Sequence, residues 1–143
     1  MKNSKPHKTV ISMSFGGFGY VKALEDKLNE AINEGYIIFV SAGNDNINAC
    51  EPKNSKDFKT YSGYRKVIAV GATTSNLYGD GIYRANYSNY GECVDIFAPA
   101  DTLCAQTTKG YKGVKKGGGT SSATPVVAGV AATIMSEFSN IEF

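Results

Sequence analysis

The chain has 143 residues, with 15 Lys and Arg against 13 Asp and Glu, and a formal net charge of +2 at pH 7. This near balance argues against nucleic acid as a partner, because a nucleic-acid binder usually carries a clustered basic face. With 42% hydrophobic residues, including 9 Tyr and 7 Phe, the chain has enough apolar material to exclude disorder. No run approaches the ~18 apolar residues of a membrane span, and the length suits one domain.

The first part of the chain predicts one strand–helix–strand unit. Residues 10–14 form a short apolar run that Gly16 and Gly17 stop, as is typical of a strand. From residue 20 onward, apolar residues recur at helical spacing, and Gly35 is a natural residue to follow the last helical turn. Residues 36–40 are apolar on both faces, which indicates a strand covered on both sides in a parallel sheet.

The second part of the chain alternates polar loops with short strands. Residues 45–64 and 75–91 are polar and predict two long loops. Residues 120–138 predict a helix whose apolar side chains surround most of its axis, as in a buried helix. This order of elements favours an α/β fold with a mostly parallel sheet. The remaining predicted strands cover residues 67–70, which Gly71 would end, 94–98 and 103–106.

The glycine-rich segment before the last helix, residues 117–125, reads Gly-Gly-Gly-Thr-Ser-Ser-Ala-Thr-Pro. A helix start offers free N–H groups and a dipole that favours negative charge. Three interpretations are open. The segment is a flexible loop with a serine N-cap; it binds a nucleotide phosphate, although the Gly-x-x-x-x-Gly-Lys-[Ser/Thr] pattern is absent; or Ser121 is a nucleophile beside N–H groups that stabilise an oxyanion.

Two further segments combine small residues with a strand end. Residues 41–44, Ser-Ala-Gly-Asn, follow the buried strand directly, at the edge where α/β proteins place ligands. They would form a shallow wall with one amide donor, or an ordinary turn. The glycines of residues 14–17, Ser-Phe-Gly-Gly, would leave the backbone free to pair with an extended peptide, or would simply end a strand.

In this order and spacing, the three segments resemble the subtilisin-like serine proteases (peptidase S8), nearest the proteinase K and aqualysin branch. That family's Ser-Leu-Gly-Gly, Ala-Ala-Gly-Asn and Gly-Thr-Ser-Met-Ala-Thr-Pro motifs correspond to residues 14–17, 41–44 and 119–125. The resemblance covers almost the whole chain and extends to residues 70–74, 87–91 and 95–99. It implies a three-layer α/β/α fold with a mostly parallel sheet, of which residues 1–143 form the C-terminal half of a catalytic domain.

The resemblance also implies a role for individual residues. Ser121 corresponds to the nucleophile that forms an acyl-enzyme, and Asn44 to the side-chain donor of the oxyanion hole. Ser122 stands where the family usually has Met. The substrate would be a polypeptide, bound along Ser14, Phe15 and Gly16, with a wall of the specificity pocket formed by Ser41, Ala42 and Gly43.

The upstream part of the family's catalytic machinery is absent from these residues. The triad order is Asp, then His, then Ser, and the Asp-Thr/Ser-Gly and His-Gly-Thr motifs precede the segment that corresponds to residues 14–17. The one histidine, His7, lies in neither motif, and we expect it to be exposed. We therefore expect a serine endopeptidase whose 143 residues alone are inactive and whose partner is the missing N-terminal half or a pro-region. The alternative is a catalytically inactive fragment or pseudoprotease that binds a peptide or partner chain.

The three cysteines allow at most one internal disulfide. The resemblance to the aqualysin-like branch implies that Cys50 pairs with Cys93, which would indicate an oxidising compartment, extracellular or secretory. The alternative is three reduced thiols. The start of the chain is basic and then apolar, but Ser12 and the glycines interrupt it, so we do not expect it to be a signal peptide.

No cofactor is expected for the reaction, and no Cys or His spacing indicates zinc. The resemblance implies a structural calcium ion, held by the carboxylate of Asp95 and the backbone carbonyls of Arg65 and Val67. Such an all-oxygen set suits calcium. The alternative is that Asp95 is a buried, hydrogen-bonded strand residue.

Overall fold

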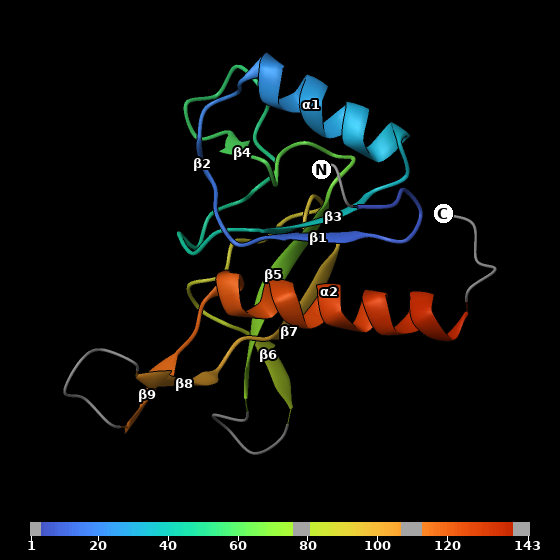
Figure 1. Cartoon of the computed structure of the whole chain (residues 1–143). Coiled ribbons are helices and arrows are strands. Elements are labelled where there is room, and N and C mark those ends of the chain that lie inside the picture. The colour runs from blue at the N-terminus through green and yellow to red at the C-terminus, as the bar shows by residue number, and fades with distance from the viewer. Residues whose placement is uncertain (1–3, 76–80, 107–112, 139–143) are drawn as a thin grey trace.

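The computed structural model describes residues 4–75, 81–106 and 113–138, and a five-stranded sheet lies at its centre (Figure 1). Four strands run parallel in the spatial order β1, β3, β5 and β7, and β6 pairs antiparallel with β5. The parallel order confirms the predicted α/β sheet. The bounds are β1 Val10–Met13, β3 Ile37–Ser41, β5 Ile68–Ser75, β6 Ile82–Arg84 and β7 Ile96–Pro99.

Two helices, α1 (Lys22–Asn33) and α2 (Thr120–Glu137), cover opposite faces of the sheet (Figure 1). Successive strand side chains point to opposite faces. Phe39 therefore packs in one core cluster with Ala123 of α2, whereas Val40 packs in the other with the apolar stripe of α1. This arrangement confirms the three-layer α/β/α fold and the prediction that the strand over residues 36–40 is covered on both sides.

The predicted end of the first helix is confirmed. Glu34 is the last residue of helical conformation, and Gly35 follows it with a φ of 90°. A left-handed conformation at this position is the usual reason for glycine after a helix.

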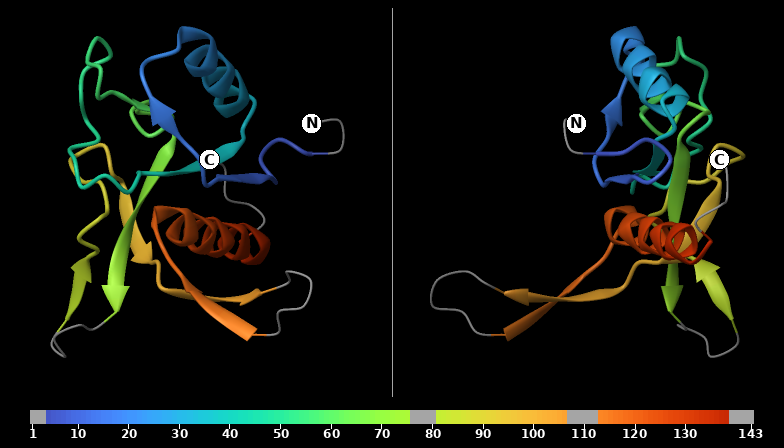
Figure 2. Two further views of the ribbon diagram at one scale, coloured as in Figure 1. Left: turned by 90° about the vertical axis from the view of Figure 1, so that its left-hand side faces the viewer. Right: turned by 45° about the vertical axis from the view of Figure 1, so that its right-hand side comes forward.

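Pairing with other strands produces short strands within the predicted loops. Strand β4 (Lys59–Thr60) lies in the segment expected to be a loop and pairs antiparallel with β2 (Gly17–Phe18). Strand β6 likewise interrupts the second predicted loop. The predicted strand over residues 103–106 is confirmed as β8 (Thr102–Gln106), which forms with β9 (Gly113–Gly117) a hairpin that projects from the body (Figure 2).

Gly71 does not end its strand, contrary to the prediction. Strand β5 continues through Gly71 to Ser75, and the ring of Phe97 on the neighbouring strand lies against the glycine. A Cβ at Gly71 would come within 2.3 Å of that ring. The absence of a side chain at Gly71 therefore leaves room for the Phe97 ring of β7, and the glycine does not end the strand.

The prediction that the last helix is buried all round is wrong for one face. Ala123 and Ala128 are buried against the sheet. On the outer face, however, the side chains of Val126, Val130 and Ile134 are 43%, 55% and 44% exposed. Strand β1 pairs only with β3 in the described part of the chain. An apolar helix face and one edge of the sheet are therefore left uncovered.

A disulfide joins Cys50 to Cys93, whose Cα atoms are 5.3 Å apart, as the resemblance implied. Cys104 on β8 is free and exposed. Within the described ranges, no helix is both long and apolar enough to cross a membrane.

Candidate active site

The carboxyl end of β1 meets the start of α2 through Ser14 and Ser121. The Ser121 hydroxyl donates to the backbone carbonyl of Ser14 at 3.2 Å, and the Ser14 hydroxyl donates to the carbonyl of Ser121 at 2.8 Å. In a regular helix the carbonyl of residue 121 would accept from the N–H of residue 125, which is the proline Pro125. Ser14 therefore supplies the hydrogen bond that Pro125 cannot make.

The helix cap differs from the serine N-cap that was one interpretation of the sequence. The N-cap is Gly119, with a φ of 99° and no side-chain cap. Ser121 lies in the first turn, where helical N–H groups have no intrahelical partner. A side chain at Gly119 would also crowd the amide of Asn44, because a Cβ there would lie 3.2 Å from its Nδ2 atom.

Asn44 is held in one orientation by Thr120. Its Oδ1 atom accepts from the backbone N–H of Thr120 at 2.8 Å and from the Thr120 hydroxyl at 3.0 Å. Thr120 is fully buried, and its hydroxyl also accepts from the N–H of Gly43 at 3.2 Å. Because both donors engage the oxygen, the Nδ2 group of Asn44 is left as a donor beside the start of the helix.

A buried asparagine, Asn89, supports the loop that carries Asn44. Its Oδ1 atom accepts from the N–H groups of Asp45 and Ile47 at 3.0 and 3.2 Å, and its Nδ2 donates to the Ala42 carbonyl at 2.8 Å. A Cβ at Gly43 would come within 2.4 Å of that Nδ2 atom. No role was predicted for Asn89 from the sequence, and the signal available there was the resemblance of residues 87–91 to the family.

One cavity of about 210 Å³ brings the predicted site residues together. Its lining includes Ser121, the segment that follows β3, and residues 14–18, which run from the end of β1 into β2. Asp45, Lys59 and Thr60 line it too, and they were missed because Lys59 and Thr60 lie in a segment predicted to be a loop. The predicted residues that line this cavity are Ser14, Phe15, Gly16, Ser41, Ala42, Gly43, Asn44 and Ser121.

A charged pair lies in this cavity. The Lys59 ammonium donates to Oδ2 of Asp45, and the Lys59 side chain is 7% exposed whereas that of Asp45 is 42% exposed. The same ammonium lies 3.4 Å from the centre of the Phe18 ring. The hydrogen bond from Lys59 holds the pKa of Asp45 below its ordinary value, so the carboxylate is charged at neutral pH.

His7 is exposed, as expected, and lies far from Ser121. Its backbone N–H donates to the carbonyl of Gly35 at 2.9 Å, just before β3 begins. It therefore lies at the amino end of the parallel strands. The length of β1, about 13 Å for four strand residues, separates it from Ser14. The site thus takes no histidine from this chain.

The oxygen donors expected to hold calcium lie at the start of β5 and β7. Asp95 is exposed, contrary to the alternative of a buried strand residue, and its Oδ2 accepts from the N–H of Ala69 at 2.7 Å. Its other carboxylate oxygen makes no hydrogen bond or ion pair with the described residues. No cluster of three or more His, Cys, Asp or Glu side chains occurs among the residues with a described position.

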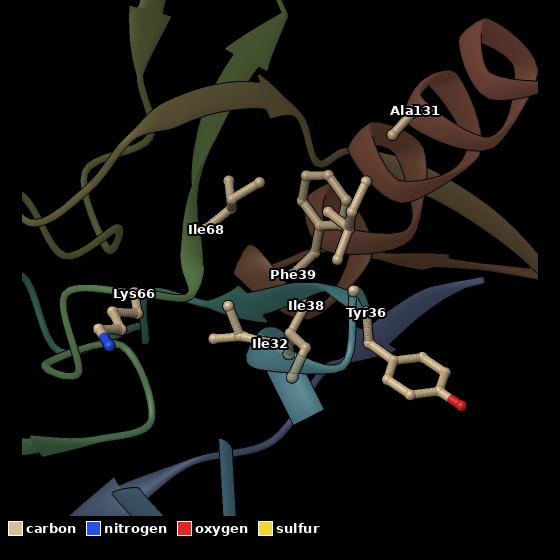
Figure 3. Close-up of a pocket in the computed structure, with 9 residues that line it drawn as sticks. Ile32, Tyr36, Ile38, Phe39, Lys66, Ile68 and Ala131 are labelled. Atoms are coloured by element: carbon tan, nitrogen blue, oxygen red, sulfur yellow. The ribbon is translucent and has the colours of Figure 1, made fainter. Parts of the chain in front are cut away.

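A second cavity, of about 550 Å³, lies at the amino ends of β3 and β5 (Figure 3). Ile32 and Ile38 lie on one side of β3, and Phe39, Ile68 and Ala131 on the other. Its lining is mostly apolar, with Lys66 beside it. Its described lining offers no serine or cysteine nucleophile and no acid–base pair, unlike that of the first cavity.

Comparison with known proteins agrees with this geometry. The model of the Subtilase family matches residues 2–142. The chain is 42% identical over 123 residues to an extracellular serine proteinase of Thermus sp. (strain Rt41A), covering 86% of this chain and 27% of that protein. It is 39% identical over 134 residues to alkaline serine exoprotease A of Vibrio alginolyticus, covering 93% and 22%.

Among solved structures, the crystal structure of a cold-adapted subtilisin-like serine proteinase matches with a TM-score of 0.73 and 33% sequence identity. The match covers 95% of this chain and 44% of that one. The chain therefore spans about a quarter of the two curated relatives, and less than half of the solved one.

Proposed function

Because this chain belongs to the subtilase family, we propose that it forms the nucleophile-bearing part of a serine endopeptidase that hydrolyses peptide bonds in polypeptides. The observation that supports this most is that Ser121 and Asn44 line the same cavity. Acyl transfer needs a reachable nucleophile beside donors that stabilise an oxyanion. Both groups are held here by backbone and side-chain hydrogen bonds.

In the proposed reaction, the polypeptide lies along residues 14–16 as an added strand. Ser121 Oγ forms a bond to the carbonyl carbon, and its proton passes to a base. The carbonyl oxygen becomes an oxyanion that accepts from Nδ2 of Asn44 and the N–H of Ser121. The C–N bond then breaks, the amine leaves with the proton, and water hydrolyses the acyl-enzyme on Ser121.

The base and the acid that orients it belong, in this proposal, to a segment outside these 143 residues. The Ser121 hydroxyl now donates to the carbonyl of Ser14, which cannot take its proton. The one histidine of the chain, His7, lies at the amino end of the strands, whereas Ser121 lies near their carboxyl end. The complementary segment would also cover the free edge of β1 and the exposed face of α2, which makes it the principal partner of this chain.

A serine-directed fluorophosphonate tests the proposal. We expect it to modify the longest natural protein that contains this chain, and to do so at Ser121. Ser121→Ala should abolish the labelling, whereas Ser122→Ala should retain it, because the Ser122 hydroxyl points back to the carbonyl of Gly118. Labelling that persists unchanged in Ser121→Ala would contradict the proposal.

A second candidate is a peptide-binding module without catalysis. The hydrogen bond from Ser121 to Ser14 favours it, since a hydroxyl that has no base beside it is not activated. The native transcript distinguishes the two functions. If it encodes Asp-Thr-Gly and His-Gly-Thr motifs upstream of Met1, the protein is a peptidase; if it lacks both, the binding module is favoured.

We further propose an extracellular or secretory location. The disulfide between Cys50 and Cys93 supports it, because such bonds persist in oxidising compartments. The Thermus relative is itself named as extracellular. Fractionation of the source cells would test this, and recovery of the protein only from a reducing cytosol would contradict it.

Calcium remains a proposal with a defined ligand set. Asp95 has one unengaged carboxylate oxygen, and Arg65 and Val67 would add carbonyl oxygens, the hard donors that calcium prefers. When bound, the ion would stabilise the fold and take no part in the reaction. We expect calcium to raise the melting temperature of the natural protein but not that of Asp95→Asn, and an equal rise in both would contradict the site.

A further inference from the structure

The substrate cavity contains an ion pair that is built into the fold. Lys59 and Phe18 are direct partners in the β2–β4 ladder, so the lysine stem is fixed by backbone pairing. Its ammonium lies between the Phe18 ring and the carboxylate of Asp45. An ammonium is attracted to the face of an aromatic ring, the more so when it is shielded from water.

The carboxylate is fixed from the other side. Asn89, which is fully buried, accepts from the backbone N–H of Asp45 and also donates to its Oδ2 at 3.3 Å. Oδ2 therefore accepts from both Lys59 and Asn89, while the side chain keeps 42% of its surface exposed. Asp45 lines the cavity, and its partly exposed carboxylate can accept further hydrogen bonds there.

The charges of the pair cancel, and this limits which side chain the cavity takes. A substrate carboxylate would meet Lys59 but would also meet the like charge of Asp45. A substrate ammonium would be attracted to Asp45 but repelled by Lys59. An apolar side chain would remove water from the exposed carboxylate without replacing its hydrogen bonds, which is costly. An uncharged amide can accept from Lys59 and donate to Asp45 at once.

We propose that the Lys59–Asp45 pair is the specificity determinant of this cavity and that it selects an uncharged, hydrogen-bonding side chain of the glutamine type. Several hydroxyl groups in the same cavity suit such a side chain, among them those of Ser41, Thr60 and Ser62. This inference rests on the proposed function in one respect, namely that the cleft binds a polypeptide. It does not require catalysis.

The test measures binding to the longest natural protein that contains this chain. Four tetrapeptide amides, Ala-Ala-Ala-X with X as Gln, Glu, Lys or Leu, are titrated by NMR, with the Gly16 and Gly43 amides reporting on the cavity. We expect the Gln peptide to bind about tenfold more tightly than the others, the ratio expected for one good hydrogen bond. Asp45→Asn should shift the preference to Glu, and Lys59→Met should shift it to Lys.

The opposite directions of these two shifts separate specificity from a loss of structure, which would weaken all four peptides together. Lys53→Met is the matched control, because Lys53 also pairs with a carboxylate, Glu25, and lies over a ring, Tyr20, but outside this cavity. Peptides that bind with an unchanged order in both pocket variants would overturn the inference and leave the proposed function standing. Absence of binding by every peptide would contradict the peptide cleft itself, and the inference with it.

Discussion

The backbone N–H and the hydroxyl of Thr120 both donate to Oδ1 of Asn44, at 2.8 and 3.0 Å. Two residues that are 76 positions apart therefore fix one amide, so that its oxygen is engaged by Thr120 and its N–H₂ group is left as a donor. A reversed amide would place an acceptor where the proposed oxyanion develops. The orientation of Asn44, and not only its presence, is what the proposed chemistry requires.

This relationship predicts a contrast between two substitutions of Thr120. Thr120→Val keeps the shape but loses the hydroxyl, so the amide keeps one donor, and we expect the rate of fluorophosphonate labelling to fall about tenfold, as for loss of one hydrogen bond. Thr120→Ser should remain near wild type. Equal labelling of the Thr120→Val and wild-type proteins would contradict this orienting role.

Removal of the donor itself, by Asn44→Ala, should cost about 10²–10³-fold in turnover, a magnitude that comes from subtilisin itself.

Asn89 should be essential for the loop that carries Asn44. Asn89→Ala removes a fully buried side chain and leaves the N–H groups of Asp45 and Ile47 without their acceptor. We expect the free energy of unfolding to fall by about 3 kcal/mol, since buried unsatisfied groups cost ~1–3 kcal/mol each. Asn86→Ala, at an exposed position three residues earlier, is the control. Chemical denaturation measures the free energy of unfolding of both variants. A loss in Asn89→Ala no larger than that in Asn86→Ala would show that the loop does not depend on Asn89.

The disulfide should contribute to stability through the length of chain it closes. Cys50 and Cys93 are 43 residues apart, and the chain-entropy model gives about 3–4 kcal/mol for a loop of that size. We expect the double variant Cys50→Ser, Cys93→Ser to lose this amount in urea denaturation. Cys104→Ser should change little, because Cys104 is free and exposed. Equal stability of the double variant and wild type would mean that the bond does not constrain the unfolded chain.

The exposed face of α2 should make the isolated 143-residue chain self-associate. Val126, Val130 and Ile134 present a continuous apolar stripe, and β1 adds a free strand edge that can pair with another chain. We expect sedimentation to show concentration-dependent oligomers, and substitution of the three residues by Gln to shift the chain toward monomer. Ala132→Gln, also on the exposed side, is the control. A monomeric wild-type chain with a cooperative melt would count against its being part of a larger domain.

The Lys59–Asp45 pair should give a defined pH dependence. Its hydrogen bond lowers the pKa of Asp45 in the folded protein, so the stabilisation is complete above the ordinary value of about 3.9 and is lost as the pH falls through the lowered value. The difference in free energy of unfolding between wild type and Asp45→Asn should therefore be constant near neutral pH and shrink below about pH 4. When Lys59→Met is present in both proteins, this difference in free energy of unfolding should no longer change with pH. A pH dependence that survives in that background would have to come from another group.

Local patterns were sufficient where a segment's own periodicity decides its structure. The apolar run of residues 36–40 is buried on both faces, and helix α1 ends just before Gly35, because both features depend on neighbouring residues. The site residues that follow strand ends were also located, since small residues and an amide stand out there. Ser121 and Asn44 indeed line the same cavity.

Long-range pairing explains what the sequence could not reveal. Lys59 lies in a polar segment and reads as a solvated loop residue, yet Phe18, 41 positions earlier, draws it into a two-residue ladder with its side chain buried. Gly71 reads as a strand end, but it accommodates a ring from a strand that follows 25 residues later. The exposed stripe of α2 has an apolar composition typical of burial, and in the proposed function the complementary segment would cover it.

The central claim is that this chain holds the nucleophile and the oxyanion donor but not the base. The most direct test compares the rate of fluorophosphonate modification of Ser121 in the 143-residue chain with that in the natural protein that includes any preceding segment. We expect rapid modification only when the preceding segment is present, with the isolated chain slower by at least about 10³-fold, the scale of loss when triad groups are removed. Equal rates in the two proteins would show that these residues activate Ser121 by themselves and would contradict the claim.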